Sequence, residues 1–190
     1  MVTTAILFVL LGVASVTDLR WGMIFNWTTY PGILIALAGN LAATLVGIDL
    51  ATSHDATRLG MVGIEQSLTA LLMCGGIMLV CYVFFAGGVG GGDIKLIAMI
   101  GAFLGVEQGV TAMLWTFVLG GCFALITLIW KVGAVTLLAS CARYVWFSLR
   151  TGARAPLGEE QRARLETQLY LAPSAVVAVM IVRLRLIELF

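Results

Sequence analysis

One stretch of this chain, residues 110–130, reads VTAMLWTFVLGGCFALITLIW and contains no charged side chain. An apolar run of about 20 residues is long enough for an α-helix to cross the hydrocarbon core of a bilayer. The rest of the 190-residue chain is similar, with 61% hydrophobic residues, 11% charged residues and a mean hydropathy of +1.07. Soluble domains carry about 25% charged residues, so this composition predicts an integral membrane protein. A net charge of +1 also argues against a nucleic-acid partner.

Five more apolar segments accompany this one and complete a set of predicted membrane-spanning helices. The six segments are residues 2–17, 29–48, 67–86, 94–106, 110–130 and 169–187. The predicted fold class is therefore all-α, a polytopic membrane protein, with residues 1–190 forming a single membrane-embedded domain. The charged and aromatic stretch 131–149 fits a helix lying in the headgroup region better than a seventh span, which stays the alternative. Residues 150–168 form the only polar run, predicted to be a cytoplasmic loop.

The basic residues of the connections predict the orientation. Eight of them follow the first, third and fifth segments, whereas the connection after the second segment contains one, Arg58. The positive-inside rule places the first group in the cytoplasm and both termini outside. Asp18, which ends the first segment, and Asp93, which opens the fourth, would then face the cytoplasm together.

These two aspartates stand out because ionisable groups at membrane depth are costly and by default suggest function. Asp93 alone could be an ordinary N-cap, whereas Asp18 lies at a helix C-terminus, where the macrodipole disfavours an anion. Five of the six residues 87–92, just before Asp93, are glycine. Such a run is tolerated at membrane depth only where it lines protein or a water-filled cavity. Its spacing does not fit the phosphate-binding loops, and close helix packing is the remaining alternative.

Two nearby carboxyl groups can share one proton, because both cannot easily ionise together. One would act as the base that activates water, and the other as the acid that protonates the scissile carbonyl oxygen. This is the chemistry of aspartic peptidases, and it needs no cofactor and no metal. A zinc site is also not expected, because the single histidine, His54, lies far from any cysteine.

The surroundings of both aspartates resemble a known family, the type IV prepilin and archaeal preflagellin peptidases. The GxGD signature of that family is matched by Gly90-x-Gly92-Asp93, followed by Lys95-Leu96. Its first-aspartate motif resembles Asp18-Leu19-Arg20 with Ile24-Phe25-Asn26, although Phe25 replaces the usual proline. Ala172-Pro173 is similar to the proline-containing opening of the family's last span, where Tyr170 replaces another proline.

The resemblance implies a membrane aspartic endopeptidase that cleaves leader peptides from prepilin or pseudopilin precursors. It places the enzyme in a bacterial or archaeal cytoplasmic membrane, with the active site facing the cytoplasm and with pilus or secretion components as further candidate partners. The residue-by-residue comparison makes Asp18 and Asp93 catalytic, and it makes Gly90, Gly92, Lys95, Arg20 and Asn26 binding or loop residues. Because the first span begins at residue 2, the chain resembles the short peptidase-only members, such as those of tight-adherence (Flp) pili. We therefore expect no methyltransferase activity.

Two alternatives use similar features. The presenilin and signal-peptide-peptidase group also has a GxGD sequence, but its first aspartate follows a tyrosine deep in a span, whereas Thr17 precedes Asp18 here. A small transporter or channel would also use broken helices and intramembrane carboxylates. Against it, the chain has no second glycine-rich break.

Overall fold

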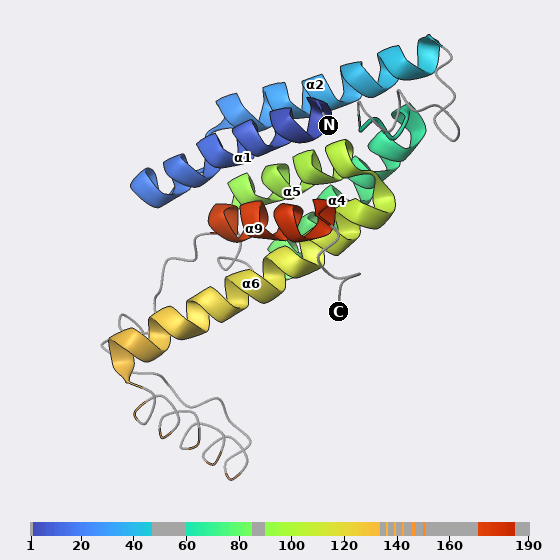
Figure 1. Cartoon of the computed structure of the whole chain (residues 1–190). Coiled ribbons are helices and arrows are strands. Elements are labelled where there is room, and N and C mark those ends of the chain that lie inside the picture. The colour runs from blue at the N-terminus through green and yellow to red at the C-terminus, as the bar shows by residue number, and fades with distance from the viewer. Residues whose placement is uncertain are drawn as a thin grey trace. The chain divides into compact units, whose positions relative to one another are not determined.

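The computed structural model describes residues 2–46, 60–84, 90–133 and 171–184, together with the single positions 136, 139, 142, 146 and 150. Within these ranges the regular elements are all helices, shown in Figure 1. They are α1 (Val2–Trp21), α2 (Asn26–Leu45), α4 (Ile64–Phe84), α5 (Gly91–Leu104), α6 (Val106–Val132) and α9 (Leu171–Arg183). Each predicted apolar segment overlaps one of them, with differences at the ends. The protein is an all-α polytopic membrane protein.

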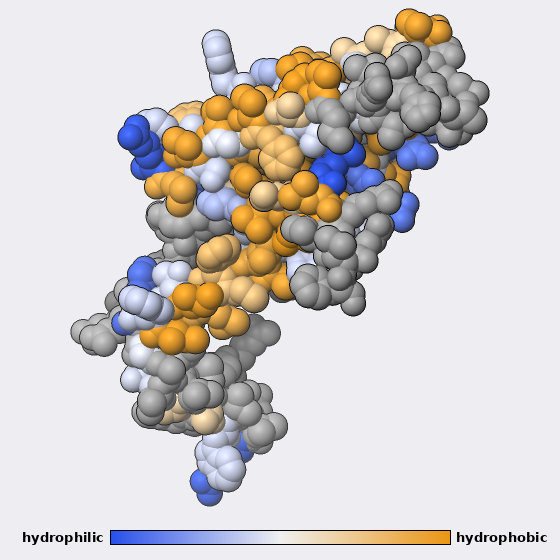
Figure 2. Space-filling view, viewed as in Figure 1, coloured by the Kyte–Doolittle hydropathy of each residue, from blue (hydrophilic) through white to orange (hydrophobic). Residues whose placement is uncertain are grey.

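Four of these helices, α1, α2, α4 and α6, are long and apolar enough to cross a membrane. The other two are shorter, 14 residues in α5 and 13 in α9. Large apolar side chains are exposed on the outer faces of the long helices, for example Val9, Leu34, Leu72 and Leu114. Figure 2 shows such hydrophobic side chains over much of the visible face. Lipid tails would cover this surface, because the exposure of such a large apolar area to water is unfavourable.

Helix α5 forms the centre of the bundle, and every residue from Leu96 to Leu104 is buried. It packs against α1, α2, α4 and α9. Glycine allows the close approach to α4, since a Cβ atom on Gly101 would lie 2.8 Å from the carbonyl oxygen of Ala70 on that helix. At Gly105, with φ of +79°, the chain leaves α5 and turns into α6. The left-handed conformation at this turn favours glycine.

The contacts divide the chain into two compact units, which we describe separately. Residues 1–119 and 170–190 form the first unit, which contains both aspartates, and residues 120–169 form the second. The predicted interfacial helix at 131–149 lies largely outside the described residues, and the polar loop at 150–168 lies outside them except for its first position. Both therefore stay predictions.

Candidate active site

Asp18 lies in the last turn of α1, where its side chain is only 6% exposed. The backbone N–H of Ala172 donates a hydrogen bond of 3.1 Å to its Oδ2 atom. Because α9 begins at Leu171, this N–H belongs to the first turn of the helix. The N–H groups of a first turn have no acceptor within their own helix. The positive end of α9 therefore faces the carboxylate. The sequence argument considered only the unfavourable C-terminus of α1, and it missed this compensation.

Asp93 is the third residue of α5 and closes the first turn of that helix. The N–H of Gly90 donates to Asp93 Oδ2 at 3.1 Å, and the N–H of Asp93 donates to the carbonyl oxygen of Gly90 at 3.0 Å. Gly90 is thus the N-cap residue, and the alternative that gave this position to Asp93 is wrong by three residues. Asp93 still helps to cap the helix, because its Oδ2 atom accepts the hydrogen bond from the Gly90 N–H. In the part of the chain that the structure describes, its Oδ1 atom accepts no hydrogen bond.

The two carboxyl groups interact electrostatically. Asp93 lies outside the four membrane-spanning helices, and its pKa rises from the ordinary 3.8 to about 6. Burial is the main cause, the Gly90 N–H opposes the rise, and the negative charge of Asp18 adds to it. The helices that carry the pair, α1 and α5, are packed against each other. The structure therefore brings together two acids that are 75 positions apart in the sequence.

Gly90 and Gly92 both lie at close contacts, and the contact at Gly92 is the tighter one. A Cβ atom on Gly92 would lie 2.9 Å from Cβ of Ile24, in the turn between α1 and α2, and one on Gly90 would lie 3.1 Å from Asp93 Oδ2. Gly90 has a φ of −79°, and neither glycine is among the described residues with positive φ. Glycine therefore serves close approach at these two positions, and not left-handed backbone geometry. Residues 87–89 lie outside the described ranges.

Lys95 and Asn26 form a second link beside the aspartates. The Lys95 Nζ atom donates to Asn26 Oδ1 at 2.7 Å and lies 4.8 Å from the centre of the Tyr30 ring. Asn26 is the first residue of α2, so this bond joins α2 to the start of α5. Arg20, in contrast, is exposed and forms no hydrogen bond or ion pair within the described ranges. Of the three polar residues predicted to bind substrate or shape the loop, Lys95 and Asn26 meet and Arg20 stays apart.

A comparison with family models now bears on this arrangement. The type IV leader peptidase family matches residues 5–125, which is more than half of the chain and includes Asp18 and Asp93. The chain belongs to this family. No curated protein and no solved structure gives a significant match. The family identifies the protein as a peptidase that acts on precursor substrates, and α9 lies beyond the matched residues.

Sequence reasoning missed three contacts of this leader peptidase family member, at Ala172, Ile24 and Tyr30. Tyr30 lies four residues after Asn26, a spacing that places both on the same helix face, and this signal was available. Pro173 near the start of α9 marked a helix N-terminus. The carboxylate that this N-terminus meets comes from another helix, however, and no local pattern identifies it.

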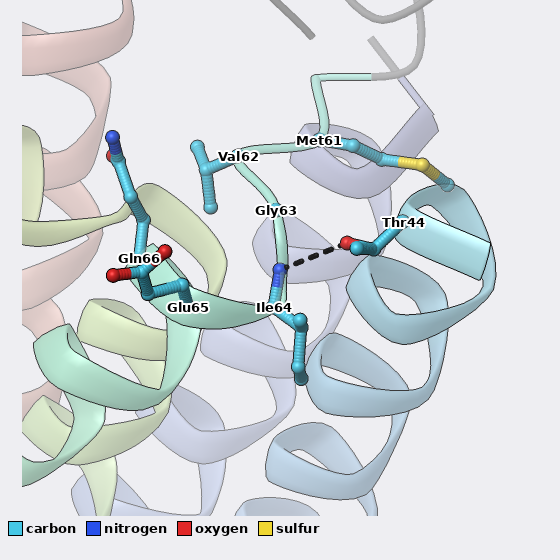
Figure 3. Close-up of a pocket in the computed structure, with 7 residues that line it drawn as sticks. All are labelled: Thr44, Met61, Val62, Gly63, Ile64, Glu65 and Gln66. Atoms are coloured by element: carbon cyan, nitrogen blue, oxygen red, sulfur yellow. Dashed lines mark hydrogen bonds between the residues drawn. The ribbon is translucent and has the colours of Figure 1, made fainter. Parts of the chain in front are cut away.

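A pocket of about 580 Å³ lies elsewhere in the peptidase, lined by Thr44 and residues 61–66 (Figure 3). The N–H of Ile64 donates to Thr44 Oγ1 at 3.2 Å within it. Thr44 is near the end of α2, and Asn26, which bonds to Lys95 beside the aspartates, begins the same helix. About 27 Å of helix therefore separates the pocket from Asn26. It is not part of the candidate active site. Within the described ranges no group of three or more His, Cys, Asp or Glu side chains could hold a metal ion.

Proposed function

We propose that this protein is a membrane aspartic endopeptidase in which Asp18 and Asp93 form the catalytic pair. Its substrate would be a prepilin-like precursor, of the type IV or Flp class, cleaved between leader and mature chain at the cytoplasmic membrane face. The observation that carries the proposal is the electrostatic interaction of the two carboxyl groups, by which the charge of Asp18 favours the protonated form of Asp93.

A pair that holds one proton can hydrolyse a peptide bond. The ionised carboxylate takes a proton from water, the resulting hydroxide attacks the carbonyl carbon, and the protonated carboxyl gives its proton to the carbonyl oxygen. The tetrahedral intermediate then collapses: the carboxyl that took the proton from water passes it to the leaving nitrogen, and the other carboxylate takes a proton back from a hydroxyl of the intermediate. No described residue donates a hydrogen bond to Oδ1 of Asp93, so this oxygen can do that work while Oδ2 accepts the N–H of Gly90.

Aromatic side chains support a site at the membrane surface. The turn between α1 and α2 adjoins the start of α5. In and beside this turn, Trp21, Phe25 and Trp27 are exposed, the last of them by 90%. Tryptophan is enriched where membrane and water meet. A transporter, in contrast, would have its carboxylates near the midplane. The surface location therefore favours a peptidase that meets its precursor at the headgroup level.

The decisive experiment co-expresses the protein with pilin-like precursors encoded near it and follows the loss of the leader by gel mobility and mass spectrometry. Asp18→Asn and Asp93→Asn should each abolish cleavage while the protein still inserts, because one carboxyl cannot be both acid and base. Glu107→Gln, which changes an exposed acid in the first turn of α6, should cleave normally. Cleavage should also resist EDTA.

Several results would contradict the proposal. Cleavage by either asparagine variant would show that the replaced aspartate is not catalytic. Loss of cleavage with EDTA would contradict a metal-free reaction. If the unaltered protein cleaves no precursor, the transporter becomes the better hypothesis. The expected lack of methyltransferase activity stays a prediction.

A further inference from the structure

Helix α9 contributes directly to the surroundings of Asp18. The Ala172 N–H, which donates to Asp18 Oδ2 at 3.1 Å, comes from a residue 154 positions later in the chain. Both partners are buried, Asp18 with 6% and Ala172 with 0% of its surface exposed. The first turn of α9 thus presents a backbone donor to a buried acid.

A buried carboxylate needs such donors, because burial favours its neutral form. The charged or titratable residues of α1 and of the three helices packed against it are Arg20 on α1, Tyr30 on α2, Asp93 and Lys95 on α5, and Arg183 on α9. None of them forms an ion pair or hydrogen bond with Asp18 in the described part of the chain. A negative charge on Asp93 would disfavour the ionised form of Asp18, because the two charges have the same sign. Support for an ionised Asp18 therefore comes from the backbone of α9.

We propose that the N-terminus of α9 is the third part of the catalytic site and that Ala172 is its positioning residue. Its N–H orients the Asp18 carboxylate and favours the ionised form, so that Asp18 is the base that takes the proton from water and Asp93 holds the shared proton. This inference rests on the proposed function. It means that α9, although outside the family-matched residues, must be docked on α1 for cleavage.

The test removes this one N–H without adding bulk. Ala172 is replaced by lactic acid in the full-length protein, made by cell-free translation into nanodiscs, so that an ester oxygen stands where the N–H was. The matched control is the same replacement at Ala178, which is also fully buried in α9 but lies about 9 Å further along the helix. The control loses an N–H inside the helix and leaves Asp18 untouched.

The ester at position 172 should lower kcat by tenfold or more and move the acidic limb of the kcat profile up by about one pH unit, the effect of one hydrogen bond to a charged group. KM for the precursor should change less than twofold. The ester at position 178 should leave the acidic limb where it is in the unaltered protein. If the acidic limb is the same in both esters, the proposal is wrong.

Infrared titration gives a readout that does not depend on cleavage. With ¹³C-labelled aspartate, and with Asp18→Asn to assign the band, the Asp18 carboxylate signal should vanish at a higher pH in the 172 ester than in the 178 ester. An unchanged titration would overturn the proposal. If the unaltered protein cleaved no precursor, the proposed function would fail, and the infrared result would still decide whether α9 supports the charge of Asp18.

Discussion

Gly92 and Ile24 touch so closely that no side chain fits between them: a Cβ atom added to Gly92 would lie 2.9 Å from Cβ of Ile24. Gly92 is in the first turn of α5, one residue before Asp93, and Ile24 lies in the turn that follows α1. The contact therefore determines how closely the segment carrying Asp93 approaches the segment carrying Asp18.

Gly92→Ala should reduce kcat/KM for a precursor by about tenfold or more, because the clash must push the start of α5 away from the turn. Gly91→Ala is the matched control, since a Cβ atom there meets no atom of the described residues within 4 Å, and it should cleave normally. The double variant Gly92→Ala/Ile24→Gly should recover part of the loss, because it restores the space. Equal activities of the two alanine variants would show that the contact does not position the pair.

The pKa of Asp93, raised to about 6 by burial and by the charge of Asp18, predicts a pH dependence. The reaction needs a protonated acid, and this proton is lost as pH rises through that value. Cleavage should therefore be fastest near or below pH 6 and fall towards tenfold per unit above pH 7. Initial rates in nanodiscs between pH 5 and 8.5 measure this directly. A rate that stays constant from pH 6 to 8 would exclude Asp93 as the proton donor.

Lys95→Met should lower kcat/KM by about tenfold, because it removes both the 2.7 Å bond to Asn26 and the contact of the cation with the Tyr30 ring. Lys95→Arg should retain part of the activity, since guanidinium can donate to the same oxygen. Lys131→Met removes an exposed lysine at the end of α6 and controls for the loss of one positive charge. If Lys95→Met and Lys131→Met behave alike, the link between α2 and α5 has no part in cleavage.

Asn40 stabilises the opposite end of the bundle. Its side chain is 3% exposed and accepts a hydrogen bond from the N–H of Val62 at 3.0 Å. Asn40→Ala leaves that donor unpaired, so the free energy of unfolding should fall by about 1–3 kcal/mol. Asn40 Nδ2 also donates to the carbonyl oxygen of Ala102 at 3.4 Å, but losing this bond should matter little, because the oxygen keeps the 2.7 Å bond from the Ser67 hydroxyl.

Reversible unfolding in mixed micelles of SDS measures this change. Thr111→Val, which removes an exposed hydroxyl that bonds within its own helix, should change stability by less than about 0.5 kcal/mol. An Asn40→Ala variant as stable as Thr111→Val would show that the buried amide contributes nothing.

The helices were largely predictable, because each apolar segment must satisfy its own backbone hydrogen bonds in lipid. Their ends were not: α1 extends past residue 17 to Trp21, and α5 begins at Gly91 instead of residue 94. Polar residues at membrane edges do not interrupt a helix, so hydropathy places such boundaries poorly. Among the candidate site residues, Lys95 and Asn26 could be named but not joined, since 69 positions separate them.

The sequence by itself determined that this is a polytopic membrane protein of helices and that two acids, Asp18 and Asp93, lie at helix ends in a recognisable pattern. Composition and local spacing are enough for both statements, because the bilayer and the helix period act on neighbouring residues. Only the tertiary structure decided that Gly92 meets Ile24 and that Ala172 donates to Asp18. Those contacts depend on how separate helices pack. Every residue except proline has the same backbone N–H, so the sequence does not indicate which group a particular N–H will bind.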